Sequence, residues 1–70
     1  MRFYETYNHH TKKKYWWTQR DVDGRCAEIR KNENGRFDLL ICDHYKSTHE
    51  TLQEAMDESK KYVGEHVVNH

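Results

Sequence analysis

Two cysteines and a histidine, Cys26, Cys42 and His44, are the residues best suited to bind a metal ion. Thiolate and imidazole groups are good zinc ligands, and His9 or His10 could complete a tetrahedral set. The chain has no Cys-x-x-Cys pair, however, and the three residues lie on predicted strands, which place ligands poorly. We therefore expect two small, semi-polar cysteine side chains on a sheet, with a zinc site at Cys26, Cys42 and His44 as the alternative.

Nucleophilic catalysis has one candidate pair in this sequence, Cys42 with His44 as its base. The two serines have structural interpretations, because Ser47 matches a helix cap and Ser59 lies on the predicted helix. A chain of 70 residues has little room for a deep cleft with a supporting layer of residues around it. We expect neither an enzyme nor a cofactor.

Three segments, residues 13–20, 25–31 and 36–43, are predicted to be strands joined by tight turns. The first is rich in aromatic residues and reads KKYWWTQR. Residues 1–12 are expected to add a fourth strand and a basic loop. We expect that loop to be solvated, with contact to phosphate as the alternative. The order of the segments predicts an antiparallel meander.

The strand register follows from loop length, because side chains alternate between the two faces of a sheet. A three-residue loop at 33–35, with its glycine at positive φ, places Ile29 opposite Leu39. A two-residue turn would instead mix apolar and charged residues on one face. The same reasoning for the loop at 22–24, again with its glycine at positive φ, places Trp17 opposite Ile29.

This register separates a core face from a face that we call the helix-free face. The predicted core face carries Tyr15, Trp17, Ala27, Ile29, Phe37, Leu39 and Ile41. The predicted helix-free face carries Trp16, Thr18, Arg20, Cys26, Glu28, Arg30, Asp38, Leu40, Cys42 and His44. On it, Arg30 is expected to form a cross-strand ion pair with Asp38, with Trp16 over the guanidinium.

A C-terminal helix is predicted to cover the core face. Residues 47–50 match a capping box, with a hydroxyl at the cap and Glu three residues later. Leu52, Met56 and Val63 then recur at helical spacing, and Gly64 is a plausible stop. The fold class is therefore α+β, a three- or four-stranded antiparallel meander followed by one C-terminal helix packed on one sheet face.

Composition points to one small domain over residues 1–70, with a frayed tail at 65–70. Twelve basic and twelve acidic residues give a net charge of zero, without the basic excess typical of DNA-binding modules. Neutrality weakens self-repulsion and allows a weak homo-oligomer. The sequence has no membrane-length apolar run and no signal-peptide core, so we expect a cytoplasmic protein with reduced cysteines and no membrane partner.

Two stretches, GRCAEIR and THETLQEAMDES, carry a resemblance to a known family. With the strand between them, they resemble the AP2-type DNA-binding domain and the arm-type domains of phage integrases. The resemblance covers roughly residues 15–60. It implies a three-stranded sheet that enters the major groove and a C-terminal helix that braces it.

Carried over to this chain, the resemblance implies that Trp16, Glu28 and Arg30 face DNA. The sequence departs from the family in its third strand, where Asp38 and Leu40 replace outward basic and tryptophan residues. Its glycine also lies one residue nearer to Ala-Glu-Ile-Arg than in the plant pattern. An outward carboxylate and a neutral chain both disfavour binding to phosphate.

The helix-free face is the candidate binding site, since aromatic and arginine side chains are favoured at interfaces. Its expected partner-binding residues are Trp16, Thr18, Arg20, Glu28, Arg30, Asp38 and Leu40. In the alternative interpretation, the N-terminal segment covers this face through Phe3, Tyr4 or Tyr7.

From this site we expect a small non-catalytic binding protein, an accessory protein of a phage or mobile element that binds and inhibits a protein partner. The alternative function is an AP2-like nucleic-acid-binding module that reads DNA with Trp16, Arg20, Glu28 and Arg30.

Overall fold

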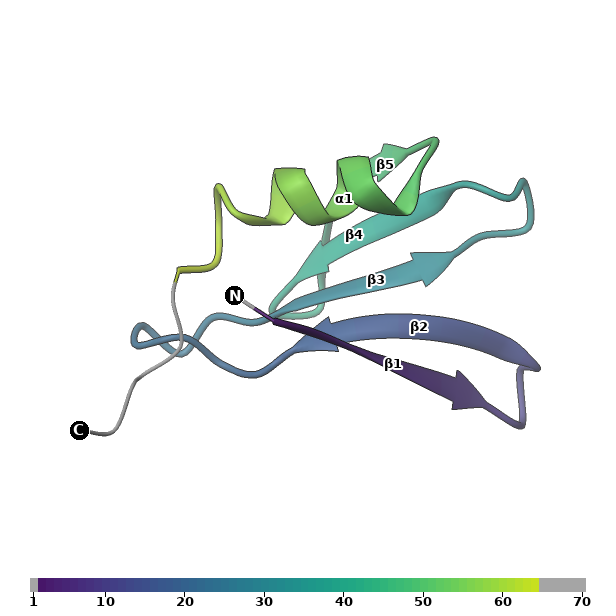
Figure 1. The fold of residues 1–70 in the computed structure, drawn as a ribbon, viewed down its shortest axis with the longest axis horizontal. Coiled ribbons are helices and arrows are strands. Elements are labelled where there is room, and N and C mark those ends of the chain that lie inside the picture. The colour runs from purple at the N-terminus through teal and green to yellow at the C-terminus, as the bar shows by residue number, and fades with distance from the viewer. Residues whose placement is uncertain (1, 65–70) are drawn as a thin grey trace.

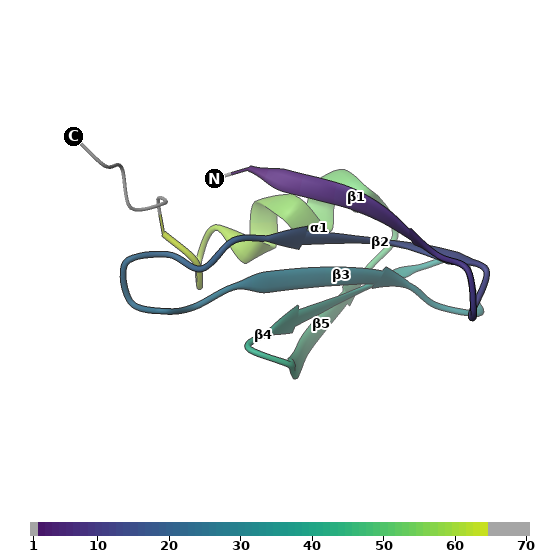
Figure 2. The same ribbon diagram turned by 90° about the horizontal axis from the view of Figure 1, so that it is seen from below.

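A computed structural model describes residues 2–64 as five strands followed by one helix (Figure 1). The elements are β1 (Phe3–Asn8), β2 (Lys13–Thr18), β3 (Ala27–Lys31), β4 (Phe37–Ile41), β5 (His44–His49) and α1 (Leu52–Ser59). All neighbouring strands pair antiparallel in chain order, and the sheet twists strongly from β1 to β5 (Figure 2). The α+β meander with a C-terminal helix is confirmed, with five strands in place of three or four. The tail expected at 65–70 lies outside the described residues.

The β3–β4 hairpin has the predicted register. Ile29 lies opposite Leu39, and Arg30 lies opposite Asp38. The three-residue loop is closed by a hydrogen bond of 2.8 Å from the Asn32 amide to the Arg36 carbonyl oxygen. Its glycine has a φ of 77°, as a bulge glycine requires.

The β2–β3 hairpin has the predicted loop but a different register. Its loop is closed by a 2.8 Å hydrogen bond from the Asp21 amide to the Arg25 carbonyl oxygen, and its glycine has a φ of 78°. Further along the ladder, Trp16 rather than Trp17 lies opposite Ile29. Between the loop and the pair that Trp17 forms with Glu28, residues 18–20 face only residues 26–27. One extra residue on the β2 side is a β-bulge, which shifts every later side chain to the other face.

The bulge reverses the prediction for all of β2. Trp16 is 9% exposed in the core and Thr18 is 4% exposed, where its hydroxyl accepts a hydrogen bond of 3.0 Å from the Ala27 amide. Trp17 and Tyr15 belong to the helix-free face instead of the core face. The assignments of Trp16 and Thr18 to the binding face were wrong. The loop determines which side chains share a face only as far as the first bulge, and both residues lie beyond it.

Strand β5 was not predicted. A two-residue turn at Cys42 and Asp43, with φ values of 51° and 68°, returns the chain along β4. The turn has the two positive φ angles of a type I′ hairpin but lacks the glycine that usually marks one. It places the Ser47–Glu50 region in or beside a strand, so the cap predicted there is wrong.

The helix begins four residues later and ends earlier than predicted. Thr51 is its N-cap, and the Thr51 hydroxyl accepts a hydrogen bond of 3.1 Å from the Glu54 amide. Thr51 and Glu54 have the spacing of a capping box, and the Thr51 hydroxyl donates a hydrogen bond of 3.1 Å to a Glu54 carboxylate oxygen. The helix ends at Ser59 with Lys60 as its C-cap, and not at Gly64.

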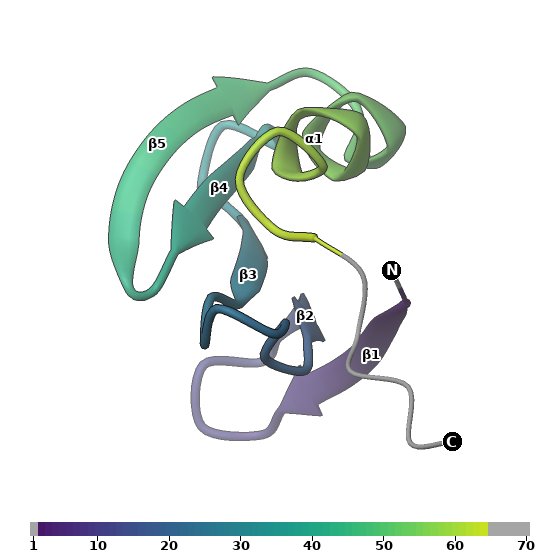
Figure 3. The ribbon, with the colours of Figure 1, turned by 90° about the vertical axis from the view of Figure 1, so that its left-hand side faces the viewer.

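The core lies between α1 and one face of β3, β4 and β5, the three strands that the helix contacts (Figure 3). Its buried hydrophobic residues are Trp16, Ala27, Ile29, Leu39, Ile41, Ala55 and Val63. Leu52 and Met56 are partly buried against it, so the predicted helical contacts are confirmed. On the opposite face of the sheet, no helix from residues 2–64 is packed. Within residues 2–64, no helix is long and apolar enough to cross a membrane.

Candidate functional site: the helix-free face

The helix-free face, as the pairing defines it, takes side chains from all five strands. Its members are Tyr4, Thr6, Asn8, Lys13, Tyr15, Trp17, Glu28, Arg30, Asp38, Leu40, Tyr45 and Thr48. Four of the seven predicted binding residues are therefore on this face: Glu28, Arg30, Asp38 and Leu40.

A stacked aromatic pair lies near the β1 edge of this face. The rings of Tyr4 and Trp17 are 4.9 Å apart at 29°, and Trp17 Nε1 donates a hydrogen bond of 3.0 Å to Thr6 Oγ1. Arg2 lies over the Tyr4 ring at 5.3 Å. The N-terminal segment is thus an edge strand that extends the face. The expectation that it folds over the face as a cover is wrong.

The centre of the face holds an ion pair between neighbouring residues of one strand. Arg30 Nε donates to a carboxylate oxygen of Glu28, so the expected ion pair of Arg30 with Asp38 is not formed although the two lie opposite each other. The hydrogen bond to Glu28 raises the pKa of Arg30 above its already high ordinary value. The Tyr15 position lies opposite Arg30 on β2, where Trp16 was expected.

Asp38 is held by hydrogen bonds instead of an ion pair. Its carboxylate accepts a hydrogen bond of 3.2 Å from Asn32 Nδ2 and one of 2.6 Å from Thr48 Oγ1. The Tyr45 hydroxyl and Thr48 Oγ1 are 2.7 Å apart and extend this network to the β5 edge. The carboxylate is thereby oriented by the β3–β4 loop and by β5, through neutral donors only.

Arg20 lies outside the face, beyond the bulge. It is exposed, and its guanidinium donates a hydrogen bond of 3.4 Å to the Gly24 carbonyl oxygen in the β2–β3 loop. The sequence-based prediction placed Arg20 on the face because it assumed that side chains alternate without interruption along residues 13–20.

The two cysteines are neighbours beside an apolar hollow on this face. The Cys42 amide donates a hydrogen bond of 3.0 Å to the Cys26 carbonyl oxygen, and both thiols are free. Burial raises the pKa of the Cys26 thiol, and the Cys42 thiol adds to the effect. His44 lies opposite Ile41 and therefore on the helix side, so its expected position beside the cysteines is wrong. In the described part of the chain, no three His, Cys, Asp or Glu side chains are grouped to hold a metal ion.

The hollow beside the cysteines has a volume of about 240 Å³ and an apolar wall of Tyr15, Trp17 and Leu40. Sequence reasoning missed Tyr4, Thr6, Tyr15 and Trp17 as members of this face. The alternation FYETYN does signal that Tyr4 and Thr6 share one side of a strand. No residue of β2 signals the bulge that brings Trp17 to the same side.

Comparison with known proteins adds no relative: no family model, no curated protein and no solved structure matches this chain. The geometry of the helix-free face is therefore the basis on which a function is proposed.

Proposed function

We propose that this protein is a non-catalytic binding module that recognises a protein partner through the helix-free face. The observation that carries the proposal is the stacked pair of Tyr4 and Trp17 on a sheet surface without a covering helix, with Tyr15 and Leu40 beside it. Aromatic side chains supply large contact area at low entropic cost and dominate the energy of many protein interfaces.

The charges of the face support a protein partner. Glu28 neutralises Arg30, and Asp38 is satisfied by neutral donors. The face can therefore be buried with Glu28 and Arg30 as a neutral pair and with two hydrogen bonds already made to the Asp38 carboxylate, which lowers the cost of desolvation at an interface. A one-domain module of this kind acts on its partner by occupying a surface, and we infer inhibition as the outcome.

The second candidate is a nucleic-acid-binding module that reads duplex DNA with the same face. Arg30 and Lys13 favour it, because both positions lie on this side of the sheet. Glu28 and Asp38 disfavour it, since they place two carboxylates where phosphate would approach. Their presence is the reason that we prefer a protein partner.

The proposal is tested by affinity selection with the wild type and two matched variants. Trp17→Ala removes an aromatic ring from the helix-free face, whereas Tyr7→Ala removes an exposed ring from the other face. A protein retained by the wild type and by Tyr7→Ala but lost by Trp17→Ala is then purified and titrated. We expect Trp17→Ala to weaken that affinity by about 2 kcal/mol or more.

Titration with duplex DNA at several salt concentrations separates the two candidates. Steeply salt-dependent binding that strengthens in Asp38→Lys would favour the nucleic-acid module, because the new lysine adds a phosphate contact. Equal retention of one partner by the wild type, Tyr7→Ala and Trp17→Ala would contradict the assignment of the helix-free face as the binding surface.

A further inference from the structure

The sheet splits between β2 and β3 at the end near the β1–β2 and β3–β4 loops. The β2–β3 ladder stops at the pair Tyr15–Arg30, whereas β2 stays paired with β1 as far as Lys13 and β3 stays paired with β4 as far as Lys31. Figure 1 shows the two hairpins diverging beyond this point. Each hairpin is continuous, so the opening lies between the hairpins.

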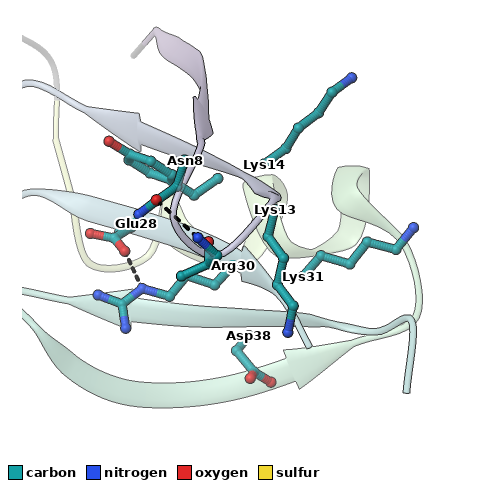
Figure 4. A pocket seen from close by; sticks show the side chains of 9 residues that line it. Asn8, Lys13, Lys14, Glu28, Arg30, Lys31 and Asp38 are labelled. Carbon is teal, nitrogen blue, oxygen red and sulfur yellow. Dashed lines mark hydrogen bonds and ion pairs between the residues drawn. The ribbon is translucent and has the colours of Figure 1, made fainter. Parts of the chain in front are cut away.

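Two open hollows border this split, one on each face of the sheet. The hollow on the helix-free side measures about 610 Å³ and the hollow on the helix side about 520 Å³. Lys13, Lys14 and Lys31 line both of them. In Figure 4 the side chains of Lys14 and Lys31 extend away from Glu28 and Arg30. We call the two hollows and the split that joins them the basic cleft, whose cationic residues are Lys12, Lys13, Lys14, Arg30 and Lys31.

Much of the positive charge of the basic cleft is uncompensated. Lys14 lies 3.8 Å from the Glu5 carboxylate, and Arg30 is paired with Glu28. Lys12, Lys13 and Lys31 form no ion pair with any residue in 2–64. Asp38 also lines the first hollow, so the five cations of the cleft stand against three carboxylates, those of Glu5, Glu28 and Asp38. The balance at this end of a neutral protein is therefore positive, with the excess on the lysines.

Aromatic rings lie along the same cleft. Tyr15 lines the hollow on the helix-free side, and Trp16 and Phe37 line the one on the helix side, packed edge to face at 5.7 Å. Tyr7, which is 46% exposed, lies at the rim of the second hollow. Lysines beside flat rings suit a ligand that has both phosphates and bases, as single-stranded nucleic acid does. An acidic peptide would use the lysines but not the rings.

We propose that the basic cleft binds a single strand of nucleic acid, with its phosphates against Lys12, Lys13 and Lys31 and a base stacked on Tyr15. The rings favour a single strand over a duplex, because only unpaired bases expose their faces for stacking. The cleft shares Tyr15, Glu28, Arg30 and Asp38 with the helix-free face. Its lysines lie outside the Tyr4–Trp17 pair, so the two proposals can be tested with different variants.

The test is a fluorescence-anisotropy titration with an oligothymidylate of about 12 nucleotides, within the range of roughly 4–16 that one small β domain of the OB type covers. The cleft variant Lys13→Gln/Lys31→Gln is compared with Lys60→Gln/Lys61→Gln, which loses the same charge beyond the end of α1. We expect the cleft variant to bind about tenfold or more weakly, with a salt slope lower by about 1.4, because each phosphate contact contributes about 0.7 for a single strand. The control variant should bind within about twofold of the wild type. Equal losses in the two variants, or no binding by the wild type, would overturn the proposal.

Further ligands separate a strand of nucleic acid from any polyanion. An abasic oligomer of the same length should bind about tenfold more weakly than oligothymidylate, and Tyr15→Leu should reduce that preference. Equal affinity for the abasic oligomer or for polyglutamate would show attraction to charge alone and would refute the site. Tighter binding to the matched duplex would refute the single strand. Trp17→Ala should keep its affinity for the oligomer, so failure here and failure of the protein-partner proposal are distinguishable.

Discussion

The two central hairpins of the sheet have loops of the same design, yet their strands pair differently. In each loop an Asn or Asp accepts two amide hydrogen bonds through Oδ1: Asn32 from residues 34 and 36, and Asp21 from residues 23 and 25, all within 2.8–3.0 Å. Both loops end in a glycine with a φ near 78°. The β3–β4 hairpin continues from its loop in an unbroken register, whereas the β2–β3 hairpin contains a bulge.

The difference between the hairpins shows what a loop determines. It sets which residues pair next to it, and both loops do so as their sequences predict. A bulge then decides which face each later side chain takes, and it moved Trp17 onto the helix-free face. The proposed binding surface therefore depends on the one hairpin whose register the loop does not determine.

The largest expected effect distinguishes the two neighbouring tryptophans of β2. Trp16→Ala should lower the free energy of unfolding by about 3–5 kcal/mol, because the ring is buried and its Nε1 donates a hydrogen bond of 3.1 Å to Glu5. Trp17→Ala should lower it by only roughly 1–2 kcal/mol, since its ring is half-buried on Tyr4. Urea unfolding of the two variants measures both values. A larger loss of unfolding free energy in Trp17→Ala than in Trp16→Ala would support the register predicted from the sequence, which has no bulge.

A smaller effect tests whether the two loops are equivalent. Gly24→Ala and Gly35→Ala should each cost about 1–2 kcal/mol, because both glycines have positive φ angles that an L-residue with a Cβ adopts at a cost. A Cβ at either position meets no atom within 4 Å, so backbone conformation alone sets the cost. Thermal unfolding should give similar losses for the two. If only one of the two substitutions destabilised the protein, the two loops would not be equivalent.

The sequence was sufficient for much of the fold because local signals were strong there. The loops at 22–24 and 33–35 carry glycine at the required position, and Leu52 and Met56 have helical spacing and both pack on the core. It was insufficient where tertiary packing decides. The β4–β5 turn lacks a glycine, and no residue of β2 marks the bulge by which Trp16 and not Trp17 is buried.

The residues of the candidate site were also predicted correctly in one hairpin and wrongly in the other. Glu28, Arg30, Asp38 and Leu40 were placed correctly because they belong to the hairpin without a bulge. Trp16 and Thr18 were placed wrongly because they precede the bulge on β2. The partner of Arg30 depended on side-chain rotamers, which strand pairing does not specify.

The smallest expected effect is a pH dependence in the β2–β3 loop that the β3–β4 loop lacks. Asp21 is 6% exposed and accepts a hydrogen bond of 2.8 Å from the Gly64 amide, which ties the loop to the segment after α1. That bond and the one from Arg25 hold the pKa of the carboxyl below its ordinary value of 3.8. The stabilisation is complete above the ordinary pKa and is lost as pH falls through the lowered folded-state pKa.

Thermal unfolding of wild type and Asp21→Asn from neutral to about pH 2 measures this dependence. The wild type should be the more stable at neutral pH, and its advantage should shrink in acid. The matched control is Gly35→Ala in the β3–β4 loop, which removes no side-chain bond to an ionisable group, so its cost should be the same at every pH. An Asp21→Asn deficit that is constant with pH would show that the carboxylate charge plays no part.

The most direct test of the account is fluorescence quenching of two variants with one tryptophan each. Trp16→Phe keeps Trp17, and Trp17→Phe keeps Trp16. Acrylamide should quench Trp17 more strongly than Trp16, and the protein partner should shield Trp17 alone, because only Trp17 lies on the helix-free face. Stronger quenching of Trp16, or shielding of Trp16 by the partner, would contradict both the register and the proposed binding face.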